Sequence, residues 1–200
     1  MAKTQMTYII LGLVIILGIA GVGIYAYSPT SDYYSYSNGN TVFDVTILSE
    51  SETKIPVYFE GDEQEYILTM RTDPASVEDI PLSGNLAQRI ANDEAVYITI
   101  DPYQDLKGKT VVAVYELMNI LDNELIYNLP TYTTVSEEYE NKTVVQCGHA
   151  NDANTVIFVT LGETTQVYAD GFCIIVEGTD EDELIRAADR LAYHLLGIME

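Results

Sequence analysis

The fold of this chain is decided by residues 154–196, which read NTVIFVTLGETTQVYADGFCIIVEGTDEDELIRAADRLAYHLL. Residues 154–161 and 172–177 are apolar and β-branched over the length of a strand, and a further short strand is expected over 165–168. Residues 180–196 have the apolar spacing of a helix. Strands that alternate with helices predict a mixed α/β layer fold, with α+β as the alternative, rather than a pure β-sandwich.

The closing helix carries signals at both of its ends. Thr179 is expected to cap it, and the four acidic residues that follow complement the helix dipole. Gly197 has the position of a C′ glycine, which ends a helix. Apolar residues recur on one face, and charged residues occupy the face predicted to be exposed. The apolar positions are Leu184, Ala188, Leu191 and Leu195, and the exposed positions are Arg186, Asp189 and Arg190.

Upstream, the same alternation extends the predicted fold back to residue 41. We expect strands over residues 41–48, 54–60, 66–72, 95–100, 132–135 and 143–147, a hairpin turn over 61–64, a short helix from Ser83 to Ala91 capped by Ser83, and a buried helix over 110–121. Together these elements predict one mixed-sheet domain over residues 41–200, which ends in the amphipathic helix.

The N-terminal part predicts a membrane anchor. Residues 8–27 are almost wholly apolar and uncharged, and about 20 such residues span the hydrocarbon core. Lys3 is the only charge before them and the next cation is Lys54, so residues 1–7 are expected in the cytoplasm and the rest outside. A cleavable signal peptide is the alternative, although its apolar region is usually shorter. Residues 28–40, rich in Ser, Tyr and Asn, are interpreted as a juxtamembrane linker.

The outer part is strongly acidic. The chain has 31 Asp and Glu residues against nine Lys and Arg, giving a net charge of −22 at pH 7, and the first acid is Asp32. This charge repels nucleic acid, which we exclude as a partner. It is compatible with hydrated cations or a cationic partner, but its simplest interpretation is a well-solvated surface.

The two cysteines, Cys147 and Cys173, predict one disulfide in an oxidising compartment, with two buried free thiols as the alternative. Asn141 begins the sequence Asn-Lys-Thr, which is a glycosylation signal if the exterior is a glycosylating one. We expect no cofactor and no metal, because two cysteines and the neighbouring His149 supply too few ligands.

The search for catalytic residues gives no constellation. Residues 107–110, Lys-Gly-Lys-Thr, end like a phosphate-binding loop, but position 103 is Tyr where the motif requires Gly. Cys147 and His149 form a nucleophilic pair only if Cys147 is reduced. His194 lies near the end of the last helix, where an imidazole is ordinary.

Carboxylates gather in three places: residues 60–65, 137–140 and 180–183. Oxygen ligands suit Ca²⁺, but none of the three clusters has a calcium-loop motif, and solvated surfaces or a helix N-terminus are the preferred interpretation. Asp101 and Asp105 follow a predicted strand and are interpreted as turn residues, although this is also the edge where a site would form.

The C-terminal part resembles the C-terminal segments of archaeal cell-surface proteins of the S-layer type. The resemblance rests on the runs Val145-Gln-Cys-Gly, Asn151-Asp-Ala-Asn-Thr-Val, Cys173-Ile-Ile-Val-Glu-Gly and Glu183-Leu-Ile-Arg-Ala-Ala-Asp-Arg-Leu-Ala-Tyr. It implies an archaeal envelope protein.

The chain is therefore expected to be a single-pass, non-catalytic envelope protein with a structural or protein-interaction role. Its expected partners are the bilayer, through residues 8–27, and either other envelope proteins or further copies of itself. Two alternatives remain: an extracytoplasmic domain that binds a small ligand or cation, and a pilin-like filament subunit that assembles through the apolar segment.

Overall fold

A computed structural model describes residues 31–58 and 64–200. Three predicted features lie outside these residues, wholly or in part: the membrane segment at 8–27, residues 28–30 of the linker, and residues 61–63 of the hairpin turn. Within the described ranges, no helix combines the length and the apolar character that a membrane crossing requires.

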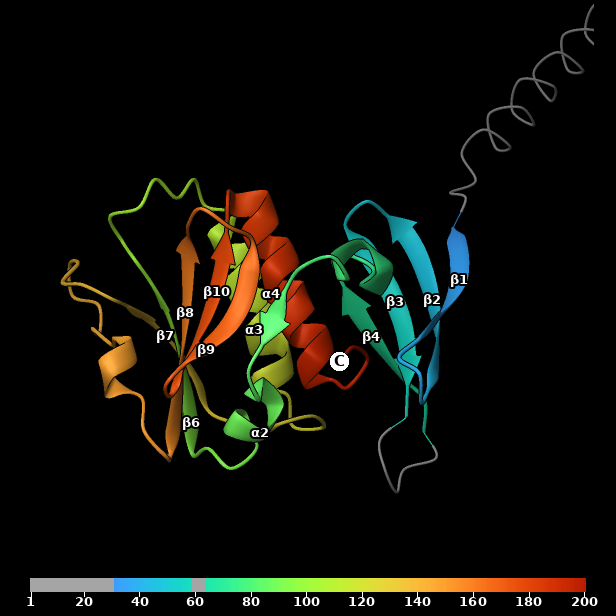
Figure 1. Cartoon of the computed structure of the whole chain (residues 1–200), viewed down its shortest axis with the longest axis horizontal. Coiled ribbons are helices and arrows are strands. Elements are labelled where there is room, and N and C mark those ends of the chain that lie inside the picture. Colours follow the sequence, from blue (N-terminus) through green and yellow to red (C-terminus); the bar gives the residue numbers. More distant parts are fainter. Residues whose placement is uncertain (1–30, 59–63) are drawn as a thin grey trace, which may run out of the picture. The chain divides into compact units, whose positions relative to one another are not determined.

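The described strands form two sheets, an arrangement that the predicted mixed-sheet domain did not specify (Figure 1). The first sheet has the order β1-β2-β3-β4 and consists of β1 (Asp32–Ser37), β2 (Val42–Ser49), β3 (Glu52–Val57) and β4 (Tyr66–Met70). The second has the order β5-β9-β10-β8-β6-β7 and consists of β5 (Leu82–Ser83), β6 (Ala95–Ile100), β7 (Thr131–Val135), β8 (Asn154–Leu161), β9 (Gln166–Asp170) and β10 (Cys173–Gly178). The mixed α/β class is confirmed.

The centre of the six-stranded sheet is parallel. β7, β6, β8 and β10 run in the same direction, whereas β9 is antiparallel to β10. Ile157 on β8 lies beside Ile98 on β6 and Ile174 on β10, and all three side chains are buried on the same face. Burial of the central strands accounts for their nearly continuous apolar sequences.

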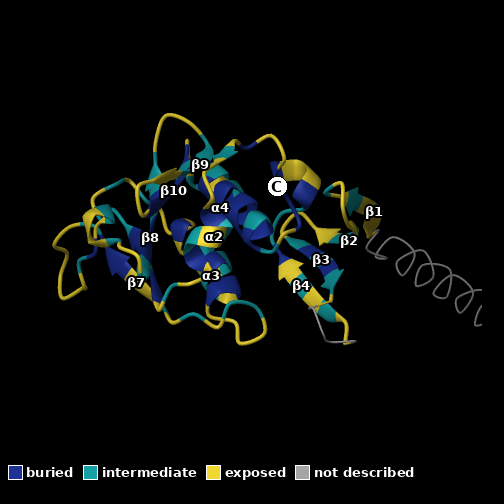
Figure 2. Cartoon of the chain, turned by 60° about the horizontal axis from the view of Figure 1, so that its bottom comes forward, coloured by how far each residue is buried: buried dark blue, intermediate teal, exposed yellow. Residues whose placement is uncertain are grey.

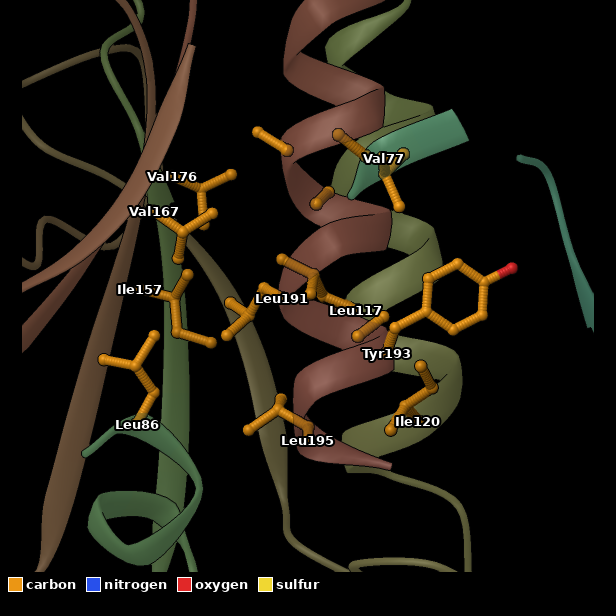
Figure 3. Packing of buried hydrophobic residues seen from close by; sticks show 14 of the residues in the cluster. Val77, Leu86, Leu117, Ile120, Ile157, Val167, Val176, Leu191, Tyr193 and Leu195 are labelled. Carbon is orange, nitrogen blue, oxygen red and sulfur yellow. The ribbon is translucent and has the colours of Figure 1, made fainter. Parts of the chain in front are cut away.

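Helices cover that face of the sheet (Figure 1). α3 (Thr110–Leu121) and α4 (Glu181–Leu195) pack against each other and, with the short α2 (Leu86–Ile90), close the main core. Figure 3 shows Leu191 of α4 beside Ile157 of the sheet, whereas Tyr193 points away from it. The predicted helix over 110–121 is confirmed.

The caps of two helices differ from the prediction. α2 begins at Leu86 after Asn85, because Ser83 pairs in β5 with Tyr168 of β9. α4 is capped by Asp180 rather than Thr179, since the Asp180 carboxylate accepts hydrogen bonds from two N–H groups of the first turn.

Two segments have a different structure from the predicted one. Residues 32–37, predicted as linker, form β1, because Tyr34 and Tyr36 pack against the main core. Residues 143–147, predicted as a strand, make only an isolated bridge between Val144 and Val135 before a short 3-10 helix, η2 (Cys147–His149).

The face of α4 predicted to be exposed is largely buried. Asp189 is fully buried and Arg190 is 8% exposed. The reason is the first sheet: β4 ends beside α4, and the Asp189 carboxylate accepts hydrogen bonds from the N–H (2.9 Å) and the hydroxyl (2.6 Å) of Thr72. α4 is therefore covered by protein on both sides.

Candidate functional site

The candidate site is the carboxyl edge of the six-stranded sheet. Its four parallel strands end there, and the chain continues from β6 to β7 on one side and from β8 towards β10 on the other. Such a reversal opens a crevice between β6 and β8, where α/β proteins usually bind ligands.

Gln104 closes this crevice. It lies in the loop after β6, and its amide nitrogen donates to the Thr160 hydroxyl (2.8 Å) and to the Leu161 carbonyl (3.2 Å) at the end of β8. Its amide oxygen accepts from the Leu161 N–H at 2.9 Å. One side chain therefore satisfies the backbone groups that a ligand would meet at this point.

The turn before α3 is a second place at this edge where a ligand could bind, and the side chain of Glu181 occupies it. The Glu181 carboxylate accepts hydrogen bonds from the N–H (3.0 Å) and the hydroxyl (2.9 Å) of Thr110, the first residue of α3. Burial acts to raise the pKa of Glu181, but these bonds and the N–H groups of Lys107 and Gly108 outweigh it, so the pKa is lowered. The loop at 107–110 is thus an anion-binding turn whose anion belongs to the protein itself.

The other acids of the 180–183 cluster also have partners. Asp180 caps α4, Asp182 accepts both of its bonds from Lys109 at 2.7 and 2.8 Å, and Glu183 pairs with Arg186 at 2.7 Å. The cluster is a helix start, as we predicted. Asp101 accepts the N–H of Tyr103 at 2.9 Å and is a turn residue, which also agrees with the prediction.

Open depressions remain at this edge. One has a volume of about 500 Å³ and is bordered by Asp105, Lys107 and Thr179 together with the filled turn. Another, of about 280 Å³, borders Asp101 and Ser136, which follow β6 and β7. Within residues 31–58 and 64–200, no three His, Cys, Asp or Glu side chains come together as a possible metal site. The arrangement stabilises the edge and joins α3 to α4; it does not assemble a nucleophile with a base.

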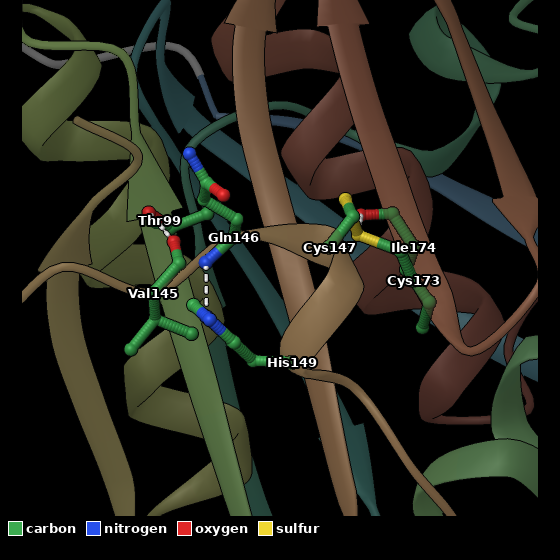
Figure 4. The surroundings of a disulfide bond; sticks show 7 residues. All are labelled: Thr99, Val145, Gln146, Cys147, His149, Cys173 and Ile174. Atoms are coloured by element: carbon green, nitrogen blue, oxygen red, sulfur yellow. Dashed lines mark hydrogen bonds between the residues drawn. A yellow bond between two sulfur atoms is a disulfide. The ribbon is translucent and has the colours of Figure 1, made fainter.

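The predicted disulfide between Cys147 and Cys173 is confirmed. It lies on the sheet face opposite the helices, within a second cluster that includes Val145 and Val156. Figure 4 shows it beside two hydrogen bonds, one from the Thr99 hydroxyl to the Val145 carbonyl (2.8 Å) and one from the Gln146 N–H to Nδ1 of His149 (2.9 Å). Because Cys147 is oxidised, the alternative of a Cys147–His149 nucleophilic pair is excluded.

The remaining predicted positions are separate from this edge. Asn141 is exposed in the loop after β7, where an acceptor must lie, and its glycosylation stays a prediction. His194 is half-buried in the last turn of α4, and burial lowers the pKa of its imidazole.

Sequence reasoning missed Gln104, and it placed Glu181 only within the carboxylate cluster at 180–183. Gln104 and Glu181 bond to partners 57 and 71 positions away. The signals for Glu181 were that cluster and the Lys-Gly-Lys-Thr loop at 107–110, which has the composition of an anion-binding turn; Gln104 had none.

Comparisons with known proteins supply no family. No protein-family model matches the chain, and no curated protein matches its sequence. Among solved structures, metalloproteinase-II from Bacteroides fragilis matches at 12% identity with a TM-score of 0.30, over 89% of this chain and 84% of that chain. A likeness at this level carries no argument about fold or activity.

Proposed function

We propose that this chain is a membrane-anchored envelope protein whose acidic outer domain has a structural or protein-interaction role. The observation that carries the proposal is the closure of the carboxyl edge from within by Gln104 and Glu181. A fold that uses its usual ligand crevice for internal hydrogen bonds leaves its outer surfaces as the places where a partner binds. The apolar segment 8–27 and the disulfide support an extracytoplasmic position.

The outer face of the first sheet is the surface best suited to a protein partner. Tyr33, Val42 and Ile67 come from β1, β2 and β4 and are 64%, 65% and 51% exposed. They lie on the side opposite to the buried Val45 and Ile55. Figure 2 shows exposed stretches of ribbon on β2 and β4. Exposed aromatic and aliphatic side chains on one sheet face are typical of contact surfaces.

The anchoring part of the proposal is tested by fractionation. The full chain is produced in cells with its native type of envelope, and the membranes are washed at high salt and at alkaline pH before protease is added from outside. We expect the chain to stay in the membrane fraction and residues 31–200 to be accessible to protease. Release of an intact chain lacking residues 1–27 would identify a cleaved signal peptide and contradict anchoring.

The interaction part is tested by site-specific crosslinking in native membranes. A photoreactive residue is placed at Ile67 and, as a matched exposed control, at Glu163 in the loop after β8. We expect stoichiometric crosslinks to a protein, or to a second copy, from position 67 and none from position 163. Equal labelling from both positions, or none from position 67, would contradict an interaction surface on the first sheet.

A further inference from the structure

A second cavity lies between the turn that joins β2 to β3 and the N-terminal parts of α3 and α4. It has a volume of about 310 Å³, and three of its lining residues are Arg71, Lys109 and Arg186. The whole chain has nine Lys and Arg residues against 31 acids. A third of its cations therefore line one cavity of a strongly acidic protein.

Two of these cations already have partners. Lys109 pairs with Asp182, and Arg186 pairs with Asp79 at 2.8 Å as well as with Glu183. Arg186 also donates to the carbonyl of Ser76. These contacts hold both side chains at the border of the cavity, where the side chains of Lys109 and Arg186 are 57% and 28% exposed.

Arg71 differs from the other two. Among the described residues it makes no ion pair, and its Nε is buried without a hydrogen-bond partner. Arg71 lies close enough to the half-buried Glu116 and the buried Asp189 for its charge to oppose the rise in pKa that burial causes in both. A guanidinium with an unused buried donor is costly unless something accepts from it.

The one cation of the lining without an ion pair favours an anion. Besides the three cations, the lining includes the acids Glu50 and Asp182 and the hydroxyl-bearing Ser51. Asp182 pairs with Lys109, and Asp79 and Glu183 pair with Arg186, so the Arg71 guanidinium is the group that can still bind an anion. An arginine fork matches the paired oxygens of a carboxylate, sulfate or phosphate. The surrounding negative protein repels large polyanions, so only a compact oxyanion suits this position.

We propose that the cavity bordered by Arg71, Lys109 and Arg186 is a binding site for a compact oxyanion. The anion accepts hydrogen bonds from the Arg71 guanidinium and is held by the charge of Lys109. Because the cavity joins the first sheet to α3 and α4, its occupation stabilises the contact between them. This site is independent of membrane anchoring and of the closed carboxyl edge.

The test uses the full chain in detergent and measures binding of sulfate, inorganic phosphate and acetate by calorimetry, with chloride keeping the ionic strength constant. We expect saturable binding of at least one of the three anions. Arg71→Gln should weaken it about tenfold or more, and Lys109→Gln, at an exposed position, should weaken it by a smaller factor. Lys142→Gln, which removes an equal charge from the loop after β7, outside the lining of the cavity, is the control and should change affinity less than about twofold.

Two results would overturn the proposal. One is the absence of saturable binding of all three anions to the unmodified chain. The other is an equal loss of affinity in Lys142→Gln, because the effect would then be general charge screening. If Arg71→Gln does not fold, as judged by circular dichroism, the proposal is tested by comparing the anion affinities of Lys109→Gln and Lys142→Gln.

Discussion

At the scale of single residues, Asp189 shows how the structure departs from an amphipathic pattern. It is fully buried on α4 and uses one oxygen to accept two hydrogen bonds from Thr72, while its other oxygen has no partner. Its pKa is raised to about 7. Burial is the largest cause and the negative charge of Glu116 adds to the rise, whereas the hydrogen bonds from Thr72 oppose it. The neutral form is therefore favoured in the folded state.

The consequence is a stability that falls as the pH rises. The folded pKa lies above the ordinary value, so the folded state binds more protons than the unfolded state between about pH 4 and pH 7, and unfolding becomes easier as pH rises through that range. We expect Asp189→Asn to remove a change on the order of 2–4 kcal/mol between pH 5 and pH 8.5. At pH 8.5 the variant should be the more stable protein.

Urea unfolding at both pH values measures this difference. Asp152→Asn, which removes an exposed carboxylate, is the matched control and should keep the pH dependence of the unmodified chain. If the unmodified chain and Asp189→Asn lose equal stability between the two pH values, Asp189 does not titrate in this range and the prediction is wrong.

Glu181 gives a second prediction at this scale. Its carboxylate is the internal anion of the turn before α3, so Glu181→Ala leaves the Thr110 N–H without its acceptor. We expect a loss of about 1 kcal/mol, a small value because the group is partly open to solvent. Added sulfate should then raise the melting temperature of Glu181→Ala more than that of the unmodified chain, by occupying the vacated turn.

The comparison for Glu181 is Glu163→Ala, which removes the same charge from an exposed loop at the same sheet edge. The sulfate response of that variant should equal the response of the unmodified chain. Equal responses in all three proteins would mean that the turn does not bind anions when Glu181 is removed.

At the scale of elements, the contact between β10 and α4 depends on Gly178. It ends the strand, and a Cβ built at this position would fall 2.5 Å from the Cα of Leu184 and clash with the Leu184 backbone nitrogen. The first turn of α4 therefore packs directly against the strand end. We expect Gly178→Ala to cost several kcal/mol, as forced overpacking of a rigid backbone does.

Gly148 offers a matched position for this measurement. A Cβ there meets nothing within 4 Å, so Gly148→Ala should change stability by less than about 0.5 kcal/mol. Chemical unfolding measures the free energy of unfolding of both variants. Similar stabilities for the two would show that the start of α4 can move away from β10.

Elements with local signals were predictable, and those held by distant partners were not. The helix over 110–121 and the strands over 95–100 and 154–161 are buried apolar runs, and the structure contains them at these positions. β1 is polar in composition and has the sequence of a linker; it is a strand because Tyr34 and Tyr36 pack against elements far along the chain. The same reason applies to Gln104, Glu181 and the cavity at Arg71, whose partners have no fixed spacing in sequence.

At the scale of the whole molecule, the first sheet was the least predictable feature. Three of its four strands were predicted one by one, but their pairing into a separate sheet was not. The chain that leaves β4 contacts α4 through Thr72, whose N–H donates to Asp189 and whose carbonyl accepts from the Tyr193 hydroxyl. A helix that is covered on both sides needs buried polar partners where its charged face meets protein. That requirement explains why Asp189 is retained on α4 and hydrogen-bonded there.

The disulfide connects the structure of the molecule to its compartment. Cys147 and Cys173 are 26 residues apart, and a closed loop of that length contributes roughly 3 kcal/mol in the chain-entropy model. We expect the double variant Cys147→Ser, Cys173→Ser to have a free energy of unfolding lower by that amount, as measured with urea. Reductant should destabilise the unmodified chain to the same extent and should leave the double variant unchanged. Mass spectrometry without reduction, on protein taken from its native compartment, should find the two cysteines joined. Two free thiols there would contradict an oxidising location, since a loop closed this favourably would form its bond wherever the compartment permits.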